Sequence, residues 1–281
     1  MLAALIALIA HCQAAQARVV DGNRIMDQRM EENLCALTFD DGPSPNTPHL
    51  LDLLGSHGIR ASFFLLGQNA ELYPHLVRRM AAEGHEIGNH SYSHPNLRRL
   101  AREAKREQIR RTDEILRGIG VTPLYMRPPY GAFDDDVAEI ASELGISVIL
   151  WSLDSHDWKS LPADYAGLRS TRGTIYEPGS LHGIFLFHDT HRSTVEDLPR
   201  IISQLVAGGC QRFVTVSEYL AGIVDPEPPA LMSRRKARPE PVPQQKSFAA
   251  GSSPVPLARS SEPWPTHGEG RLLPLAAMTA H

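Results

Sequence analysis

Two adjacent aspartates, Asp40 and Asp41, follow a short apolar run and precede Gly42-Pro43. Neighbouring carboxylates repel each other, and a cation placed between them would relieve that repulsion and keep both ionised. One carboxylate could then bind the ion, while the other stays off it and accepts a proton from water. The spacing does not decide which aspartate has which role. The alternative interpretation is an Asx turn that leads into Gly42-Pro43.

Two histidines four positions apart, His90 and His94, offer further ligands for such an ion. Two imidazoles and one carboxylate make a three-ligand site with open positions for water or substrate. The spacing alone is weak, because histidines around Pro95 would also serve as capping or surface residues. The metal interpretation gains weight if Asp41 lies at the same end of the fold.

The reaction that fits these residues is metal-assisted hydrolysis of an acyl bond. A leaving amine needs a general acid, and His188 titrates near neutral pH. A buried carboxylate would orient that imidazole, and Asp157 or Asp154 could supply it. Arg127 could pair with the base carboxylate and lower its pKa. Arg127 also opens the rigid segment "RPPYG", whose backbone N–H groups could face an oxyanion.

These polar residues follow short apolar segments that are typical of buried parallel strands. Seven such runs are present, at residues 34–39, 61–67, 85–88, 124–126, 146–152, 183–188 and 213–217. Amphipathic stretches of helical length separate them. The alternation predicts an α/β fold, either a (β/α) barrel one unit short of eight or an open doubly wound sheet. In both folds the carboxyl ends of the strands meet, so the polar residues are expected to share one site.

The longest helical stretch follows His94. Pro95 suits the first turn of a helix, and Gly120 suits its C-terminal stop. The pattern therefore predicts a helix over residues 95–120, with His94 at its cap.

Charge is unevenly distributed over the 281 residues, whose formal net charge is −4. Residues 226–281 hold seven Lys and Arg against four Asp and Glu, so the remainder holds 21 basic against 28 acidic residues. A mildly acidic body offers no attractive field for nucleic acid, and we expect no such partner. Residues 225–281 are rich in Pro and Ser, which predicts a disordered or extended tail. The sequence does not indicate an oligomeric state.

The first 17 residues predict a signal peptide. Their apolar stretch of ten residues is too short to span a bilayer, which needs roughly 20, so no stable membrane span is expected. Ala15-Gln16-Ala17 resembles a cleavage site, but no Lys or Arg precedes the apolar stretch. A buried first helix or a misassigned start codon is the alternative. We expect secretion or a periplasmic, cell-envelope location, with a cytoplasmic location as the alternative.

Two cysteines, Cys35 and Cys210, would remain after cleavage of a signal peptide. They could form one disulfide in an oxidising compartment or stay as two buried thiols. The sequence leaves both possibilities open.

Five segments in order resemble the five motifs of the polysaccharide deacetylases, the NodB-homology group also called carbohydrate esterase family 4. They are "LTFDDGPSPNTPHLL", "HEIGNHSYSHPNL", "MRPPYG", "WSLDSHDWK" and "FLFHDTH". The resemblance spans residues 33–222 and implies a distorted (β/α) barrel with about seven parallel strands, as a single catalytic domain. It implies removal of acetyl groups from N-acetylglucosamine units in chitin, chitooligosaccharides or peptidoglycan. O-acetylated xylan is the alternative substrate within the family.

The same resemblance assigns roles around the metal. Asp40 matches the catalytic base, and Arg127 matches the residue that tunes it. Three residues match the protein ligands of a divalent ion, usually zinc: Asp41, His90 and His94.

The resemblance also assigns the acid and the substrate contacts. His188 matches the general acid, and Asp157 matches the carboxylate that tunes it. Tyr130 matches the position whose backbone N–H binds the oxyanion. Trp158 matches an aromatic wall of the substrate groove, and Leu186 matches an apolar residue of the acetyl pocket.

Two other classes of function can be weighed against a deacetylase. A catalytically silent glycan-binding module would be expected to lack a ligand or the base, and here all are present. A glycoside hydrolase needs two carboxylates roughly 5–9.5 Å apart, but it has no need for a histidine pair beside them. Two residues depart from the family pattern: His156, where the family more often has an apolar residue, and Cys210, which lies in the link to the last strand.

Overall fold

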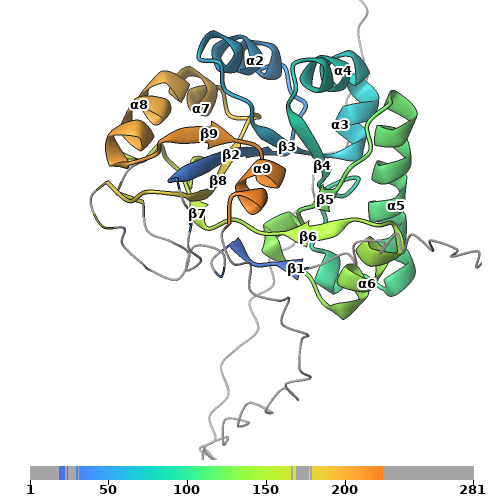
Figure 1. The fold of residues 1–281 in the computed structure, drawn as a ribbon. Helices are drawn as coiled ribbons and strands as arrows, with labels where there is room; N and C mark the ends of the chain where they lie inside the picture. The colour runs from blue at the N-terminus through green and yellow to red at the C-terminus, as the bar shows by residue number, and fades with distance from the viewer. Residues whose placement is uncertain are drawn as a thin grey trace, which may run out of the picture. The chain divides into compact units, whose positions relative to one another are not determined.

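The computed structural model describes residues 19–22, 24, 30, 32–165, 167, 168, 177 and 179–223. The predicted signal peptide and the predicted tail lie outside the described residues. None of the described helices combines the length and the apolar character needed to cross a bilayer. The described chain forms one curled sheet surrounded by helices (Figure 1).

The sheet contains nine strands within the described residues. They are β1 (Val19–Val20), β2 (Leu34–Asp40), β3 (Ser62–Leu65), β4 (Glu86–Asn89), β5 (Tyr125–Met126), β6 (Ser147–Ile149), β7 (Leu153–Asp154), β8 (Gly183–His188) and β9 (Arg212–Val214). Their order is β1-β6-β5-β4-β3-β2-β8-β7, and β9 pairs with the first residues of β2. Every pair of these strands is parallel, which confirms the predicted parallel sheet. The two strands that the sequence pattern did not indicate, β1 and β7, are only two residues long.

The sheet curls because one short segment joins its two ends. Residues 146–152 were expected to form a single strand, but the strand β6 ends at Ile149, and a separate strand, β7, follows at Leu153–Asp154. Between them, the Leu150 N–H donates to Val20 O on β1 (3.0 Å), and the Ser152 N–H donates to Ile184 O on β8 (2.9 Å). The chain therefore crosses from one edge of the strand order to the other, as a barrel requires. The predicted distorted (β/α) barrel is confirmed.

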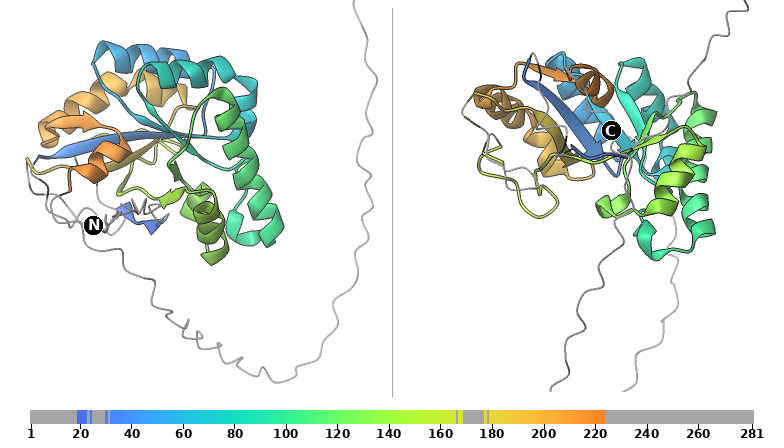
Figure 2. Two further views of the ribbon diagram at one scale, coloured as in Figure 1. Left: turned by 45° about the vertical axis from the view of Figure 1, so that its right-hand side comes forward. Right: turned by 60° about the horizontal axis from the view of Figure 1, so that its bottom comes forward.

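Helices cover the outside of the curl (Figures 1 and 2). They are α2 (Thr47–Ser56), α3 (Gly67–Leu72), α4 (Pro74–Ala82), α5 (Arg102–Ile119), α6 (Asp135–Glu143), α7 (Arg192–Glu196), α8 (Leu198–Gly208) and α9 (Val216–Ala221), with 3-10 turns η1 (Leu97–Arg99) and η2 (Pro129–Gly131). Helix α8 shows why they pack in this way. It buries Leu198, Ile201, Ile202 and Leu205, which lie on one stripe of a 3.6-residue period.

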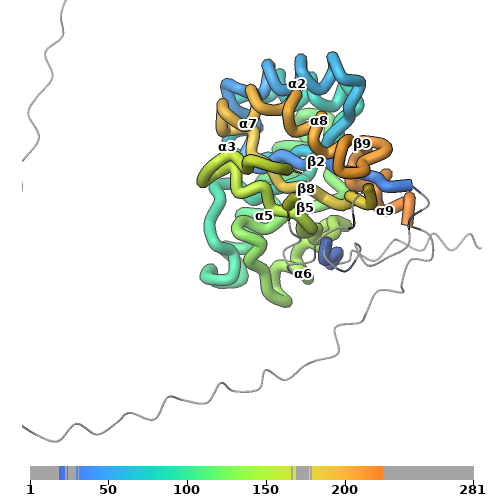
Figure 3. The backbone as a smooth tube through the Cα atoms, turned by 90° about the vertical axis from the view of Figure 1, so that its left-hand side faces the viewer, coloured from blue at the N-terminus to red at the C-terminus, as the bar shows by residue number. Residues whose placement is uncertain are grey.

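Strand β2 runs beside β8 through the middle of the sheet, as Figure 3 shows. Side chains alternate between the two faces of a strand. Cys35, Leu37 and Phe39 pack in the cluster that contains the residues of α2 and α8, whereas Leu34 and Ala36 pack in a second cluster with residues of α9. The next residues on that second face are Thr38 and Asp40. The inner face of β2 therefore changes from apolar to polar at its carboxyl end.

The prediction of a helix over residues 95–120 was wrong at its start. Helix α5 begins at Arg102, and His94 has a left-handed backbone (φ 61°) that cannot cap it in the expected way. The intervening chain makes only the short turn η1, because Leu97 inserts into the cluster that contains Met126 and Val137. The predicted stop is confirmed, since Gly120 caps α5 with φ 101°.

The two cysteines form a disulfide. Cys35 lies on β2, Cys210 lies just before β9, and their Cα atoms are 5.8 Å apart. Both residues are buried. The bond ties the amino end of β2 to the last strand of the sheet, at the opposite end of β2 from the two aspartates.

Candidate metal and catalytic site

The predicted polar site residues all lie at the last residues of β2, β7 and β8 or in the loops that follow β2, β4, β5, β7 and β8. We call this region the carboxyl edge. Five non-glycine residues of the described chain have a left-handed φ: Asp41, Ser91, His94, Tyr130 and His156. All five lie in these loops. Such backbones cost free energy and persist where the surrounding structure enforces them, which is typical of functional sites.

Asp41, His90 and His94 converge at the carboxyl edge. The Asp41 Oδ1 atom lies 3.4 Å from His90 Nε2 and 3.4 Å from His94 Nε2. One ligand atom from each residue lies within 4.8 Å of the other two, and no other such group of three was found among the described residues. Asp41 Oδ1 is buried without a hydrogen-bond partner. A carboxylate oxygen left in this way beside two imidazoles fits a divalent cation.

The orientation of His90 suits metal binding. Its Nδ1 lies 2.6 Å from the backbone oxygen of Arg127. Because a carbonyl oxygen can only accept, Nδ1 carries the proton and Nε2 presents its lone pair toward Asp41. The neighbouring His94 ring is held edge-on to Tyr130, with 4.6 Å between the ring centroids.

Electrostatics keep Asp41 and His94 in the protonation states that metal ligands need. Burial alone would raise the pKa of the Asp41 carboxyl, but the neighbouring imidazoles of His90, His94 and His188 lower it to about 2. Burial, together with the nearby His90, lowers the pKa of His94 below its ordinary value. An ionised carboxylate and a neutral imidazole are the forms that bind a metal.

Asp40 is buried beside this group and has a different partner. Its Oδ1 accepts a hydrogen bond from Arg127 Nη1 (2.8 Å), and its Oδ2 lies 3.7 Å from His90 Nε2. Arg127 is fully buried, its Nη1 also donates to Thr38 Oγ1 (2.7 Å), and its guanidinium lies 4.1 Å from the centre of the Phe64 ring. Burial lowers the pKa of Arg127, while the charge of Asp40 opposes that shift. One carboxylate oxygen of Asp40 thus binds Arg127, and the other lies near His90.

His188 forms a pair with Asp157. Its Nδ1 donates to Asp157 Oδ1 (2.7 Å), so Nε2 is the nitrogen left to exchange a proton. The second oxygen, Oδ2, accepts from the His188 backbone N–H and from Thr194 Oγ1, both at 2.8 Å. Burial would lower the pKa of His188, but the hydrogen bond and charge of Asp157 raise it to about 9. The imidazole is therefore protonated at neutral pH.

Strand register places Asp40 beside His188. Asp40 on β2 pairs with His188 on β8, so both side chains leave the same face of the sheet at the same level. The alternative carboxylate, Asp154, is not the partner of His188. It binds the backbone N–H of His156 (2.8 Å) and lies 2.9 Å from His156 Nδ1.

The three predicted substrate contacts differ in exposure. Tyr130 (67% exposed) and Trp158 (56% exposed) are among the few large apolar side chains that face solvent. Leu186 is buried on β8, two residues before His188. His156 is exposed and lies beside Trp158, with 6.1 Å between the ring centroids.

Sequence reasoning assigned no role to several residues that hold this arrangement. Thr38 holds Arg127, Thr194 holds Asp157, and Asn69 Nδ2 donates to the backbone oxygen of Asp41 (2.7 Å). Hydroxyl and amide side chains are too common in loops for such contacts to be read from a sequence. The fourth is Asp189, which is fully buried and whose pKa burial raises to about 7. Asp189 could have been identified as a candidate from the sequence, since it directly follows His188.

Comparison with known proteins agrees with this geometry. Residues 27–149 match the family model described as polysaccharide deacetylase. A peptidoglycan-N-acetylglucosamine deacetylase of Bacillus cereus is 44% identical over 187 residues, which cover 64% of this chain and 66% of that protein. The match to the peptidoglycan-N-acetylglucosamine deacetylase PgdA of Listeria monocytogenes is 39% identical over 65% of this chain, but it spans only 38% of the relative's length.

A fungal relative is matched over most of its length. The chitin deacetylase of Colletotrichum lindemuthianum is 35% identical over 215 residues, covering 73% of this chain and 86% of that protein. Its solved structure aligns with a TM-score of 0.59 at 34% identity, over 68% of this chain and 89% of that chain. The structural alignment thus extends over about two thirds of this chain and most of the fungal enzyme.

Proposed function

Because the chain belongs to the polysaccharide deacetylase family, we propose that it is a metal-dependent hydrolase that removes acetyl groups from N-acetylglucosamine units of a glycan. The observation that carries this proposal is the arrangement of the two neighbouring aspartates. Asp41 faces His90 and His94, whereas Asp40 is held by Arg127 at the edge of that group. This is the division between a ligand and a base that metal-assisted hydrolysis needs.

Asp41, His90 and His94 would hold the cation. Two imidazoles and one carboxylate with open positions suit a catalytic zinc ion, which is the metal we propose. When bound, such an ion supplies Lewis-acid polarisation of the acetyl carbonyl and makes water a stronger nucleophile at neutral pH.

Asp40 acts as the general base in this proposal. The hydrogen bond from Arg127 fixes the orientation of the Asp40 carboxylate, so its other oxygen remains free to accept a proton from the attacking water. Arg127 itself contacts no reacting atom and acts through Asp40.

His188 acts as the general acid. Its Nε2 donates a proton to the leaving nitrogen of the sugar, and Asp157 keeps the imidazole protonated and aligned until that step. The backbone N–H of Tyr130 would stabilise the oxyanion, Leu186 would line the acetyl pocket, and the exposed Trp158 would contact the sugar ring.

We propose a wall or chitin-type glycan as the substrate, and export as the route to it. Relatives are named for peptidoglycan, chitin and chitooligosaccharide deacetylation, and polymers of this kind lie outside the cytoplasm. The Cys35–Cys210 disulfide supports export, since such bonds persist in oxidising compartments.

Acetate release tests the function directly. Purified protein should release acetate from at least one of three substrates: chitooligosaccharide, peptidoglycan or acetylxylan. Activity should disappear on treatment with a chelator and return when zinc is added. Folded, zinc-loaded protein that binds these glycans but releases no acetate would instead be a binding module. Cleavage of glycosidic bonds that survives the chelator would indicate a glycosidase.

A further inference from the structure

Asp189 contacts the loop that carries the proposed metal ligand, although it lies about 150 residues further along the chain. A Cβ atom added to Gly42 would lie 2.4 Å from Asp189 Oδ2, 2.6 Å from Oδ1 and 2.8 Å from Cγ. These are the three nearest atoms to that position. Gly42 does not have a left-handed φ, so its backbone alone does not demand glycine. The carboxylate of Asp189 is therefore what excludes a side chain at position 42.

Hydrogen bonds fix Asp189 in this place. Its Oδ2 accepts from the hydroxyl of Thr47, at the start of α2. Its backbone oxygen accepts from Ser44 Oγ (2.9 Å) and, at 3.4 Å, from Asn46 Nδ2. Residues 41–47, which we call the metal loop, thus wrap around Asp189. Because Asp189 is fully buried, this contact is part of the packed interior.

The metal loop is also held by α3 and the residue before it. The backbone oxygen of Gly42 accepts from the Leu66 N–H (3.0 Å), and that of Asp41 accepts from Asn69 Nδ2 (2.7 Å). Asp41 keeps its left-handed backbone (φ 74°) between these contacts and Asp189. The metal loop is thus held by two independent sets of contacts, one with Asp189 and one with Leu66 and Asn69.

We propose that Asp189 is a positioning residue that sets the place of Asp41 relative to His188. Each of the two contacting residues is adjacent in the chain to a site residue: Gly42 follows Asp41, and Asp189 follows His188. Close packing of Asp189 against Gly42 thus fixes the separation between the Asp41 carboxylate and the His188 imidazole. The proposal rests on the proposed function for its catalytic consequence, but not for its effect on the metal loop.

A steric exchange between positions 42 and 189 tests the proposal. Gly42→Ala should force the metal loop away from Asp189 and lower zinc affinity and kcat by roughly 10–10²-fold each, since displacements of about 1 Å have effects of this size. Asp189→Ala removes the obstacle, so the double variant Gly42→Ala/Asp189→Ala should recover most of the loss. Asp189→Asn, which keeps the shape, should stay within about threefold of wild type and above Asp189→Ala.

Zinc affinity, measured by competition with a chromophoric chelator in the absence of substrate, is the primary readout. The split between kcat and KM on an acetylated glycan is the second, because a loss confined to kcat indicates misplaced catalytic groups. The matched control is Gly55→Ala on α2, where an added Cβ meets nothing within 4 Å. It should leave all values unchanged. Thermal unfolding of every variant identifies any that fail to fold.

Three results would overturn the proposal. The first is a double variant no better than Gly42→Ala alone. The second is an Asp189→Ala variant with wild-type zinc affinity and kcat. The third is an Asp189→Asn variant as impaired as Asp189→Ala, which would assign the effect to charge rather than to shape. If wild-type protein released no acetate, the proposed function would fail, while the zinc measurements would still decide whether Asp189 positions the loop.

Discussion

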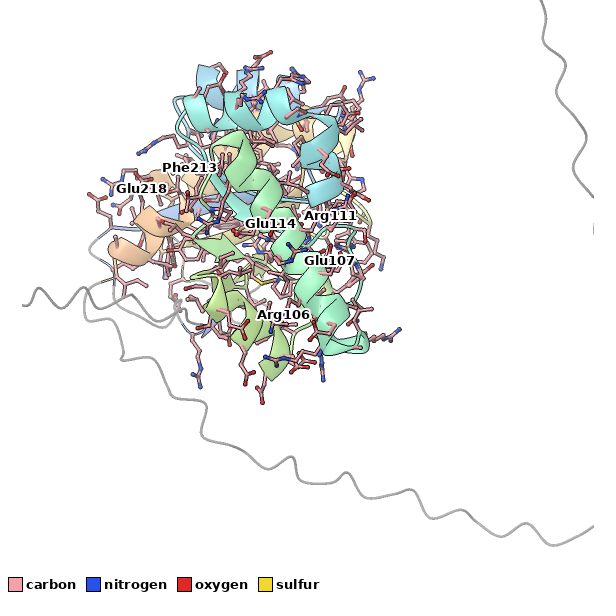
Figure 4. All side chains as sticks on the ribbon, turned by 90° about the vertical axis from the view of Figure 1, so that its right-hand side faces the viewer. Arg106, Glu107, Arg111, Glu114, Phe213 and Glu218 are labelled. Carbon is pink, nitrogen blue, oxygen red and sulfur yellow. A yellow bond between two sulfur atoms is a disulfide. The ribbon has the colours of Figure 1, made fainter. Side chains whose placement is uncertain are left out.

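The carboxyl edge and the surface of α5 treat charged side chains in opposite ways. On α5, arginines and glutamates point outward into solvent, as Figure 4 shows for Arg106, Glu107, Arg111 and Glu114. Their partners are close and easily exchanged: Arg110, for example, reaches both Glu107 and Glu114. At the carboxyl edge Asp40, Arg127 and Asp157 are buried, and each is held by a specific charged partner.

This difference indicates where a change of charge matters. Exposed ion pairs contribute little, because water screens them and holding two long side chains in place costs entropy. A buried charge without its partner is far more costly, since it has lost water and has nothing in exchange. The same chemical substitution should therefore have very different effects in the two regions.

Asp40→Asn should lower kcat by roughly 10²–10⁴-fold, because an amide cannot accept the proton from water. Zinc affinity should stay near the wild-type value, since Asp41 and the histidines remain. Acetate release and chelator competition measure the two quantities. Asp52→Asn is the control, because Asp52 is an exposed carboxylate on α2 that pairs with Arg79. An empty metal site in Asp40→Asn would show that the roles of the two aspartates are reversed.

Arg127→Gln should destabilise the fold by about 3–5 kcal/mol, because it leaves the Asp40 carboxylate buried without its guanidinium. The glutamine would also leave Thr38 Oγ1 without its donor. Chemical denaturation measures the loss, and the activity of the remaining folded protein should fall with it. A variant as stable as wild type would contradict the view that this pair is energetically coupled.

Activity should decline above about pH 9, where the His188 imidazole loses its proton. Asp157→Asn should move this alkaline limb to lower pH, because Asp157 is the group that raises the pKa of His188. It should also lower kcat by up to about 10²-fold, since the ring loses its alignment. The pH profile of kcat measures both effects. If the alkaline decline of kcat were unshifted in Asp157→Asn, a group other than His188 would be responsible for it.

The His188–Asp157 pair also makes the free energy of unfolding depend on pH. His188 has a pKa of about 9 in the folded protein, against roughly 6.5 in the unfolded chain. The folded state therefore binds the proton more tightly. The resulting stabilisation is complete below about pH 6.5 and is lost as the pH rises toward 9. Asp157→Asn should remove this dependence, which unfolding at a series of pH values would detect.

The long strands and the residues at their ends could be predicted from the sequence. Leu34–Asp40 and Gly183–His188 are uninterrupted apolar runs, and their polar last residues stand out. The two-residue strands Val19–Val20 and Leu153–Asp154 were not indicated by the sequence, because each offers too little pattern to be recognised. The pairing of β7 with β8 and of β1 with β6 depends on closure of the sheet, which is a property of the whole chain.

The failures at the site have a different cause. Pro95 and the helical pattern after it favour a helix directly after His94, yet the chain instead turns His94 toward Asp41. Local propensity was overridden by the packing of Leu97. Likewise, the contact between Gly42 and Asp189 joins positions that no local pattern connects. What the sequence does not reveal here is the support of the site rather than its chemistry.

The disulfide lies at the other end of β2 and should affect stability without affecting catalysis. Its reduction, or a Cys35→Ala/Cys210→Ala variant, should lower the free energy of unfolding by about 2–5 kcal/mol, because the bond closes a long loop. The kcat of the protein that remains folded should not change. Denaturation with and without reductant measures the first quantity and acetate release the second. A selective loss of kcat would show that the two ends of β2 are coupled.

The smallest effect should come from Arg110→Gln on α5. Arg110 pairs with Glu107 and Glu114 within its own helix, and all three side chains are exposed. Because water replaces the lost interactions, Tm should change by no more than about 2 °C, and kcat and zinc affinity should match the wild type. Arg127→Gln is the paired comparison, since it makes the same chemical change against a buried carboxylate. If the two variants were equally stable and equally active, burial would not be what separates the two regions, and the contrast between them would have no energetic basis.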